Sequence, residues 1–114
     1  MWQIKIHRLV LQEDFKKVPP FQQKEILRTV QKKLTLDPQA YGQRLPAGRK
    51  PLRGAFAGYW RLRIGDYRVV YRMIREEIVV LVIKIGIRKD NQIYGELLSR
   101  LKKTRKKRKT VENR

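Results

Sequence analysis

Arginine and tyrosine alternate with apolar residues in the stretch GYWRLRIGDYRVVYR, from residue 58 to residue 72. The stretch holds four arginines, no lysine and a single acid, Asp66. Guanidinium groups bind phosphate through paired N–H donors and stack on nucleobases. Tyrosine rings offer a further surface on which bases stack. These residue types therefore predict contact with the phosphates and bases of a nucleic acid.

The arginines are expected on one face of a β-hairpin. Gly65-Asp66 predicts a two-residue type II′ turn between strands at 59–64 and 67–74, and this turn fixes their register. One face then carries core residues, and the other carries Tyr59, Arg61, Arg63, Arg68, Val70 and Arg72. Arg63 lies opposite Arg68, and like charges in that position destabilise a sheet, so a bound anion would stabilise this face. The alternative is a solvated outer face without function.

The charge of the chain also points to an anionic partner. The 114 residues carry a net charge of +19, and residues 1–99 account for +11 of it, with twenty Lys and Arg against nine acids. A charge of this size indicates a nucleic acid, an acidic protein or an anionic membrane as partner. The longest apolar run, IVVLVI, is too short to span a bilayer.

Residues that could form a metal or redox site are scarce. The chain has no cysteine, which excludes disulfides and thiolate metal sites and favours a reducing cytoplasm. The single histidine, His7, argues against a protein-only zinc site, and no role is assigned to it. We expect neither a metal nor a small-molecule cofactor.

Four strands and three helices must position the arginines, in the order βααβββα. They are expected to form an α+β domain with an antiparallel-dominated four-stranded sheet, two N-terminal helices on one face and a C-terminal helix, all helices packing on the same sheet face. The strand at 77–85 is apolar on both faces, as in a central strand covered on both sides. The remaining predicted elements are a strand within 1–8, helices at 11–18, 20–37 and 91–103, and a long basic loop at 38–57.

The domain is expected to end at residue 101. Residues 102–114 form a low-complexity basic tail with little apolar surface, which predicts disorder when the protein is alone.

The motif LRIGDYRVVYRM, followed by EIVVLVIKIGIRKDNQIY, resembles the RelE/ParE superfamily of bacterial and archaeal toxin–antitoxin toxins. The similarity is closest to the RelE branch and extends over residues 1–101. It implies a RelE-like fold and a type II toxin that inhibits translation by cleaving messenger RNA in the ribosomal A site. It also implies a cytoplasmic protein whose partners are an acidic RelB-like antitoxin, the ribosome and messenger RNA, with no membrane.

The resemblance also implies a catalytic site of basic residues and one tyrosine. Arg61 stands where the family has a lysine, and Arg68 matches the hairpin arginine of the family. Arg88 matches the arginine after the last strand, and Tyr94 matches the tyrosine near the last helix. Tyr94 has the spacing of a half-buried packing residue as well, so that role remains an alternative. The residues expected to contact RNA around this site are Tyr59, Arg63, Arg72 and Lys89.

Two departures from the family pattern bear on the chemistry. Tyr59 replaces a second lysine, and Ile87 replaces a histidine that many relatives carry. Arginine does not readily give or take a proton, so Tyr94 is the candidate base, with its pKa lowered from ~10 by nearby arginines. Such a site needs a partner to position the RNA, and positioning can contribute roughly 7–11 kcal/mol. Two alternatives to the nuclease stay open: a gyrase-binding toxin of the same superfamily, and a basic RNA- or ribosome-binding module without catalysis.

Overall fold

The computed structural model describes residues 1–45, 58–87 and 95–102, and in these ranges the chain forms a mixed sheet with helices on both faces. The strand order is β1-β5-β4-β3-β2. β1 runs parallel to β5, and the other neighbours are antiparallel, as predicted. The strands are β1 (Gln3–Ile6), β2 (Gln43–Arg44), β3 (Tyr59–Ile64), β4 (Tyr67–Ile74) and β5 (Val79–Ile87).

The β3–β4 hairpin matches its prediction in bounds and register. Arg63 pairs with Arg68, and Tyr59 pairs with Arg72. Gly65 has a positive φ of 56°, whereas Asp66 is not among the residues with positive φ, which is the pattern of a type II′ turn. The local turn chemistry and the period-2 alternation therefore sufficed to place every side chain of the hairpin on its face.

The sheet has a fifth strand that was not predicted. β2 is only two residues long and pairs with β3, so that Gln43 lies opposite Arg61 and Arg44 opposite Trp60. The short helix α2 (Pro38–Tyr41) precedes it, and the Asp37 carboxylate caps this helix by accepting from two backbone N–H groups at 3.0 and 3.1 Å. The first residues of the predicted loop are thus ordered structure, while residues 46–57 lie outside the described ranges.

The N-terminal helices differ from each other in regularity. The segment predicted as a helix at 11–18 forms a π-helical turn, η1 (Val10–Asp14), followed by a 3₁₀ turn, η2 (Phe15–Lys17). The helix α1 (Pro20–Leu34) begins with proline at its first turn, as predicted. Its buried stripe consists of Ile26, Val30 and Leu34. No helix in the described ranges has both the length and the apolarity needed to cross a bilayer.

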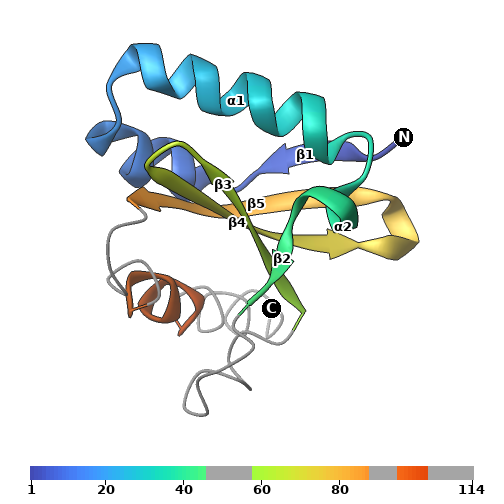
Figure 1. The fold of residues 1–114 in the computed structure, drawn as a ribbon. Helices are drawn as coiled ribbons and strands as arrows, with labels where there is room; N and C mark the ends of the chain where they lie inside the picture. Colours follow the sequence, from blue (N-terminus) through green and yellow to red (C-terminus); the bar gives the residue numbers. More distant parts are fainter. Residues whose placement is uncertain (46–57, 88–94, 103–114) are drawn as a thin grey trace.

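The two faces of the sheet have separate apolar cores. The larger core lies between the sheet and α1, and includes Leu62, Val69 and Tyr71 of the hairpin. The smaller core lies on the other face, where Leu97 and Leu101 of the helix at 95–102 pack with Val70, Ile83 and Leu45. Figure 1 shows α1 and this orange-red helix on opposite sides of the sheet. The prediction that all helices share one face was therefore wrong for the C-terminal helix.

The central strand β5 is covered on both faces, as predicted, but it begins two residues later than expected. A 3₁₀ turn, η3 (Arg75–Glu77), precedes it and ends at Ile78, whose φ of 54° and ψ of 49° are left-handed. A β-branched residue is strained in this conformation, at a cost of roughly 1–2 kcal/mol. Half of the Ile78 side chain is exposed, so little apolar burial offsets the strain.

Replacing Ile78 with glycine is expected to raise the free energy of unfolding by about 0.5–1 kcal/mol, since relief of the left-handed strain exceeds the added flexibility of the unfolded chain. Urea denaturation measures the change. Ile87→Gly is the control, because Ile87 is 57% exposed and Ile78 is 51% exposed, yet Ile87 lies in an extended strand. That control should be destabilised. A loss of stability in both variants would contradict the interpretation of Ile78 as strained.

Gly42 allows a close approach between α2, β2 and the core. The Tyr71 side chain is fully buried, and its hydroxyl donates to the carbonyl oxygen of Pro38 at 2.5 Å. Burial, reinforced by the negative charge of Asp37, raises the pKa of Tyr71, so the hydroxyl stays a donor at neutral pH. A Cβ on Gly42 would lie 1.7 Å from this hydroxyl oxygen and 3.1 Å from the carbonyl oxygen of Arg61.

Gly42→Ala is accordingly expected to destabilise the fold by about 1–3 kcal/mol, because the methyl group must displace Tyr71. Chemical denaturation measures the loss. Gly95→Ala is the control, since a Cβ there meets nothing within 4 Å. In the Tyr71→Phe background the added methyl group should cost less, because the clashing oxygen is gone. Equal costs in both backgrounds would rule out the clash as the cause.

Candidate functional site

The candidate site lies on the hairpin face that also contacts the C-terminal helix. Three of its arginines, Arg61, Arg63 and Arg68, share this face in the part described by the structure. Arg63 is exposed, and the other two are partly buried. Three further predicted site residues, Arg88, Lys89 and Tyr94, lie outside the described ranges, so their roles remain predictions. The face therefore brings together three cations at the turn end of the hairpin.

The side chain of Arg61 is oriented by Gln43. Its Nε and Nη2 atoms donate to Gln43 Oε1 at 3.4 and 3.1 Å. The pairing of β2 with β3 places these two residues opposite each other. Sequence reasoning missed Gln43, because a two-residue strand inside a loop leaves no periodicity to detect.

Tyr59 and Arg72 form a pair at the other end of this face. They are cross-strand partners, and the guanidinium carbon of Arg72 lies 5.6 Å from the centroid of the tyrosine ring. This distance is typical of a cation–π contact. Both residues were predicted to contact RNA, and the structure places them next to each other.

The face is not open along its whole length. Val70, which lies opposite Arg61, is fully buried in the smaller core with Leu97 and Leu101. Tyr59 is half-buried against the same core. The C-terminal helix therefore covers part of the predicted cationic face, and the exposed charge is concentrated around Arg63 and at Arg72.

A buried ion network holds the C-terminal helix on the sheet. Asp14, in η1, accepts hydrogen bonds from Lys84 Nζ at 2.9 Å and from the backbone N–H of Ile85 at 2.8 Å. Two nitrogens of Arg100 donate to the same carboxylate, each at 2.9 Å. The side chains of Asp14, Lys84 and Arg100 are 1%, 6% and 5% exposed, so the pairs are shielded from solvent.

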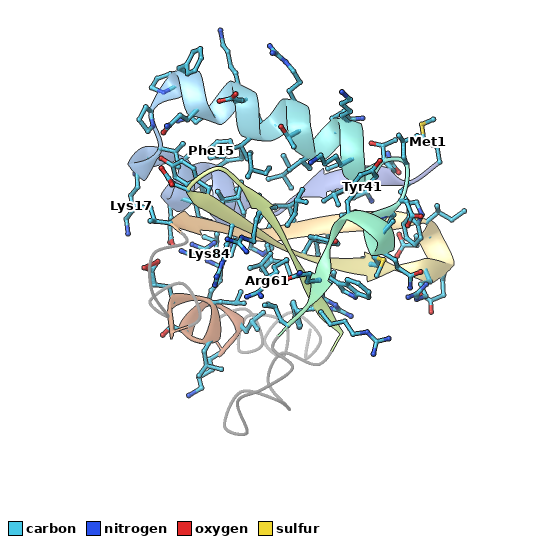
Figure 2. The ribbon with its side chains drawn as sticks, in the orientation of Figure 1. Met1, Phe15, Lys17, Tyr41, Arg61 and Lys84 are labelled. Atoms are coloured by element: carbon cyan, nitrogen blue, oxygen red, sulfur yellow. The ribbon has the colours of Figure 1, made fainter. Side chains whose placement is uncertain are left out.

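Two less buried acids complete this network. Lys84 Nζ lies 2.8 Å from Glu96 Oε2, and Arg100 Nη2 lies 2.9 Å from Glu13 Oε1. Burial alone would lower the pKa of the Arg100 guanidinium, but the hydrogen bonds and charges of Asp14 and Glu13 outweigh it and raise that pKa. Figure 2 shows Lys84 reaching from β5 toward the C-terminal helix. Sequence reasoning missed the network because its members lie on three separate segments.

The side chains that meet on the hairpin face suit phosphate binding more than metal binding. In the described ranges no group of three His, Asp or Glu residues is placed to hold a metal ion. Arginines stabilise the charge that develops on a phosphorus centre, provided that they are already oriented. The Gln43–Arg61 hydrogen bond and the fixed hairpin register supply that orientation for part of the site.

The family model of the ParE toxin of the type II toxin–antitoxin system parDE matches residues 4–92. The mRNA interferase toxin RelE of Escherichia coli strain K12 is 42% identical over 41 residues, which is 36% of this chain and 43% of that protein. The RelE protein of Shigella flexneri matches equally. The chain thus aligns with less than half the length of these curated relatives.

Solved structures share the fold at lower identity. The RelBE2 toxin–antitoxin complex of Mycobacterium tuberculosis has a TM-score of 0.63 at 23% identity, over 76% of this chain and 98% of that one. The intact E. coli RelBE complex has a TM-score of 0.56 at 17% identity, over 79% and 100% of the two chains. The RelE–RelB complex of Pyrococcus horikoshii gives 0.50 at 19% identity, over 77% and 96%.

These comparisons confirm the predicted superfamily, and the identity to RelE supports the predicted branch. The predicted fold class is confirmed as well, with the additional strand β2. Since the family model covers well over half of the sequence, the chain belongs to the ParE toxin family of type II toxin–antitoxin systems.

Proposed function

We propose that this toxin is a ribosome-dependent endoribonuclease that cleaves messenger RNA in the A site without a metal ion. The observation that carries the proposal is the gathering of Arg61, Arg63 and Arg68 on one face of a hairpin with fixed register. The stretch of 42% identity to a protein named mRNA interferase toxin supports the same chemistry. Action on the ribosome would place the protein in the cytoplasm.

Cleavage of RNA by its own 2′-OH sets three requirements. The hydroxyl must lose a proton, the dianionic phosphorane must be stabilised, and the leaving 5′-oxygen must gain a proton. In the proposed site, Arg61 and Arg68 bind the scissile phosphate through paired N–H donors and stabilise the phosphorane. Gln43 holds Arg61 in place for this task.

Proton transfer is assigned to Tyr94 on the resemblance alone. Its hydroxyl would take the 2′ proton if nearby arginines lower its pKa from ~10. General acid–base catalysis is most efficient with groups whose pKa lies near 7, and arginine and tyrosine do not meet that condition. We therefore expect weak activity on free RNA and a strong dependence on the ribosome, which positions the substrate.

An acidic RelB-like antitoxin is proposed as the partner that inhibits the toxin. Relatives of this fold are described in complexes between RelE toxins and RelB antitoxins. The charge of +11 on residues 1–99 suits an acidic protein. Co-expression with the product of a neighbouring small open reading frame, followed by affinity purification, tests the partnership. Recovery of the toxin alone from cells that grow normally would count against it.

Primer extension on messenger RNA in a purified translation system tests the nuclease. The expected result is cleavage within codons only when ribosomes translate the message, with naked RNA left intact. A second candidate, inhibition of DNA gyrase, is favoured by the match to the ParE model. A supercoiling assay run in parallel separates the two. Gyrase inhibition without cleavage would replace the nuclease, and ribosome binding without either activity would indicate a non-catalytic module.

A further inference from the structure

A hollow with a volume of about 430 Å³ lies where β2, β3 and the end of β4 meet. We name it the aromatic hollow. Its volume is within the roughly 300–1,000 Å³ typical of small-molecule sites. The side chains that matter here are two arginines, two aromatic rings and a thioether, from Arg44, Tyr59, Trp60, Met73 and Arg75.

An arginine lies beside each ring of the aromatic hollow, although only one of the two, Arg44, lines the hollow itself. The guanidinium carbon of Arg44 is 5.6 Å from the centroid of the Trp60 ring, and that of Arg72 is 5.6 Å from the Tyr59 ring. Arg75 is exposed at the end of β4. The side chains of Glu76 and Glu77 follow in the same turn, yet none of the ion pairs among the described residues involves Arg44, Arg72 or Arg75.

This combination matches the chemistry of one nucleotide. Aromatic rings and guanidinium planes both stack on nucleobases, and base–aromatic stacking contributes roughly 1–3 kcal/mol per base. Exposed guanidinium groups bind the phosphate that accompanies the base. An acidic peptide would satisfy the arginines through its carboxylates, but a flat ring beside each anionic group is a feature of nucleotides and not of peptides in general. The side chains therefore favour RNA over an acidic protein as the occupant.

The aromatic hollow is continuous with the cationic face. Tyr59 lines the hollow from the cationic face, whereas Trp60, the next residue of β3, points to the opposite face. Tyr59 lies four positions before Arg63 along β3. At the rise of an extended strand this separation is roughly 13 Å, a distance that a few nucleotides of single-stranded RNA can bridge. A strand whose phosphates lie on Arg61 and Arg63 can thus reach Tyr59 and turn at the end of β3 into the hollow beside Trp60.

We propose that the aromatic hollow is a second RNA subsite, which binds a single-stranded nucleotide flanking the scissile phosphate. The base stacks on Trp60, and Arg44 and Arg75 bind its phosphate. The flanking position rests on the proposed nuclease function, whereas nucleotide binding itself does not. No covalent step takes place at this subsite.

A matched pair of double variants tests the subsite in the full-length protein. Arg44→Ala with Arg75→Ala removes two exposed cations from the hollow, and Arg28→Ala with Lys32→Ala removes two exposed cations from α1. Fluorescence anisotropy with a labelled oligouridine measures affinity over a salt series. We expect the hollow variant to bind at least tenfold more weakly, with a salt slope smaller by about 0.7, since the two arginines neutralise one phosphate and each neutralised phosphate contributes about 0.7 for a single strand. The control should stay within twofold of the unmodified toxin. If both double variants lose the same RNA affinity, the effect is due to the overall positive charge of the protein, and the subsite is overturned.

Tryptophan fluorescence gives a readout located at the hollow itself. The chain has two tryptophans, Trp2 and Trp60, so Trp2→Phe leaves Trp60 as the sole reporter. A stacked base should quench this signal as oligouridine is added, and the quenching should be lost in the Arg44/Arg75 variant. RNA binding without any change in Trp60 emission would exclude stacking at the hollow.

The subsite and the nuclease can fail separately. Quenching of Trp60 by oligouridine in a toxin that never cuts ribosome-bound RNA would support the subsite and reject only the nuclease. Cleavage with wild-type RNA affinity in the hollow variant would reject only the subsite. If the hollow variant keeps its RNA affinity but no longer binds an acidic antitoxin peptide, the hollow is a protein-binding site and the proposal is overturned.

Discussion

Arg68→Ala is expected to lower the rate of ribosome-dependent cleavage by about 10²–10³-fold, the loss typical when one oriented donor to a developing negative charge is removed. Arg68 is fixed opposite Arg63 by the hairpin register, so a phosphate between them would contact both guanidinium groups. Arg68→Lys should lose less, because it keeps the charge but not the paired donors. Single-turnover cleavage with ribosomes in excess measures these rates. Growth arrest on expression should disappear in the alanine variant.

Stability provides the control for this substitution. Opposed like charges destabilise a sheet, so Arg68→Ala should unfold at the same or a slightly higher urea concentration than the unmodified toxin. Arg28→Ala, at an exposed position on α1, controls for the loss of one positive charge during ribosome binding. A folded Arg68→Ala toxin that cleaves at the full saturated rate would remove Arg68 from the proposed site.

The hairpin was predictable because the information that specifies it is local. The Gly65-Asp66 turn and strict alternation determine which side chains share a face, and tertiary context did not change the outcome. The helix α1 was likewise predictable, since a helical period repeated over four turns is a strong signal. Ile26, Val30 and Leu34 of its apolar positions are buried, whereas Phe21, at the same spacing, is 77% exposed. The resemblance then added candidate roles for residues that composition alone left as a basic surface.

The features that sequence reasoning missed depend on contacts between distant segments. Asp14 meets Lys84 across 70 residues and Arg100 across 86, and neither spacing has a local signature. Each of these residues would be interpreted as part of a solvated surface, although the structure buries all three. The strand β2 is specified by its partner β3 and not by its own two residues. Arg88 and Tyr94, two of the four residues predicted as catalytic, lie outside the described ranges, as does Lys89.

Asp14→Ala should have the largest effect on stability of any single substitution considered, lowering the free energy of unfolding by about 3–5 kcal/mol. Its carboxylate accepts hydrogen bonds from Lys84, Ile85 and Arg100, so the substitution leaves two buried cations with too little counter-charge. A domain of this size has only about 5–15 kcal/mol of stability in total. Urea denaturation measures the loss. Glu13→Ala is the control, because the Glu13 side chain is 57% exposed and an exposed pair contributes about 0–1 kcal/mol.

The loss should be greatest where the C-terminal helix docks. Hydrogen exchange at residues 95–102 is expected to accelerate in Asp14→Ala more than exchange in α1, because the network ties that helix to η1 and β5 while α1 packs on the other face. Replacing Asp14, Lys84 and Arg100 together by Leu, Met and Met should recover most of the stability, since apolar side chains of similar volume often equal a buried ion network. Recovery would show that the charges specify where the helix docks more than they stabilise it. A triple variant as unstable as Asp14→Ala would instead show that the network contributes net stability that apolar packing cannot replace.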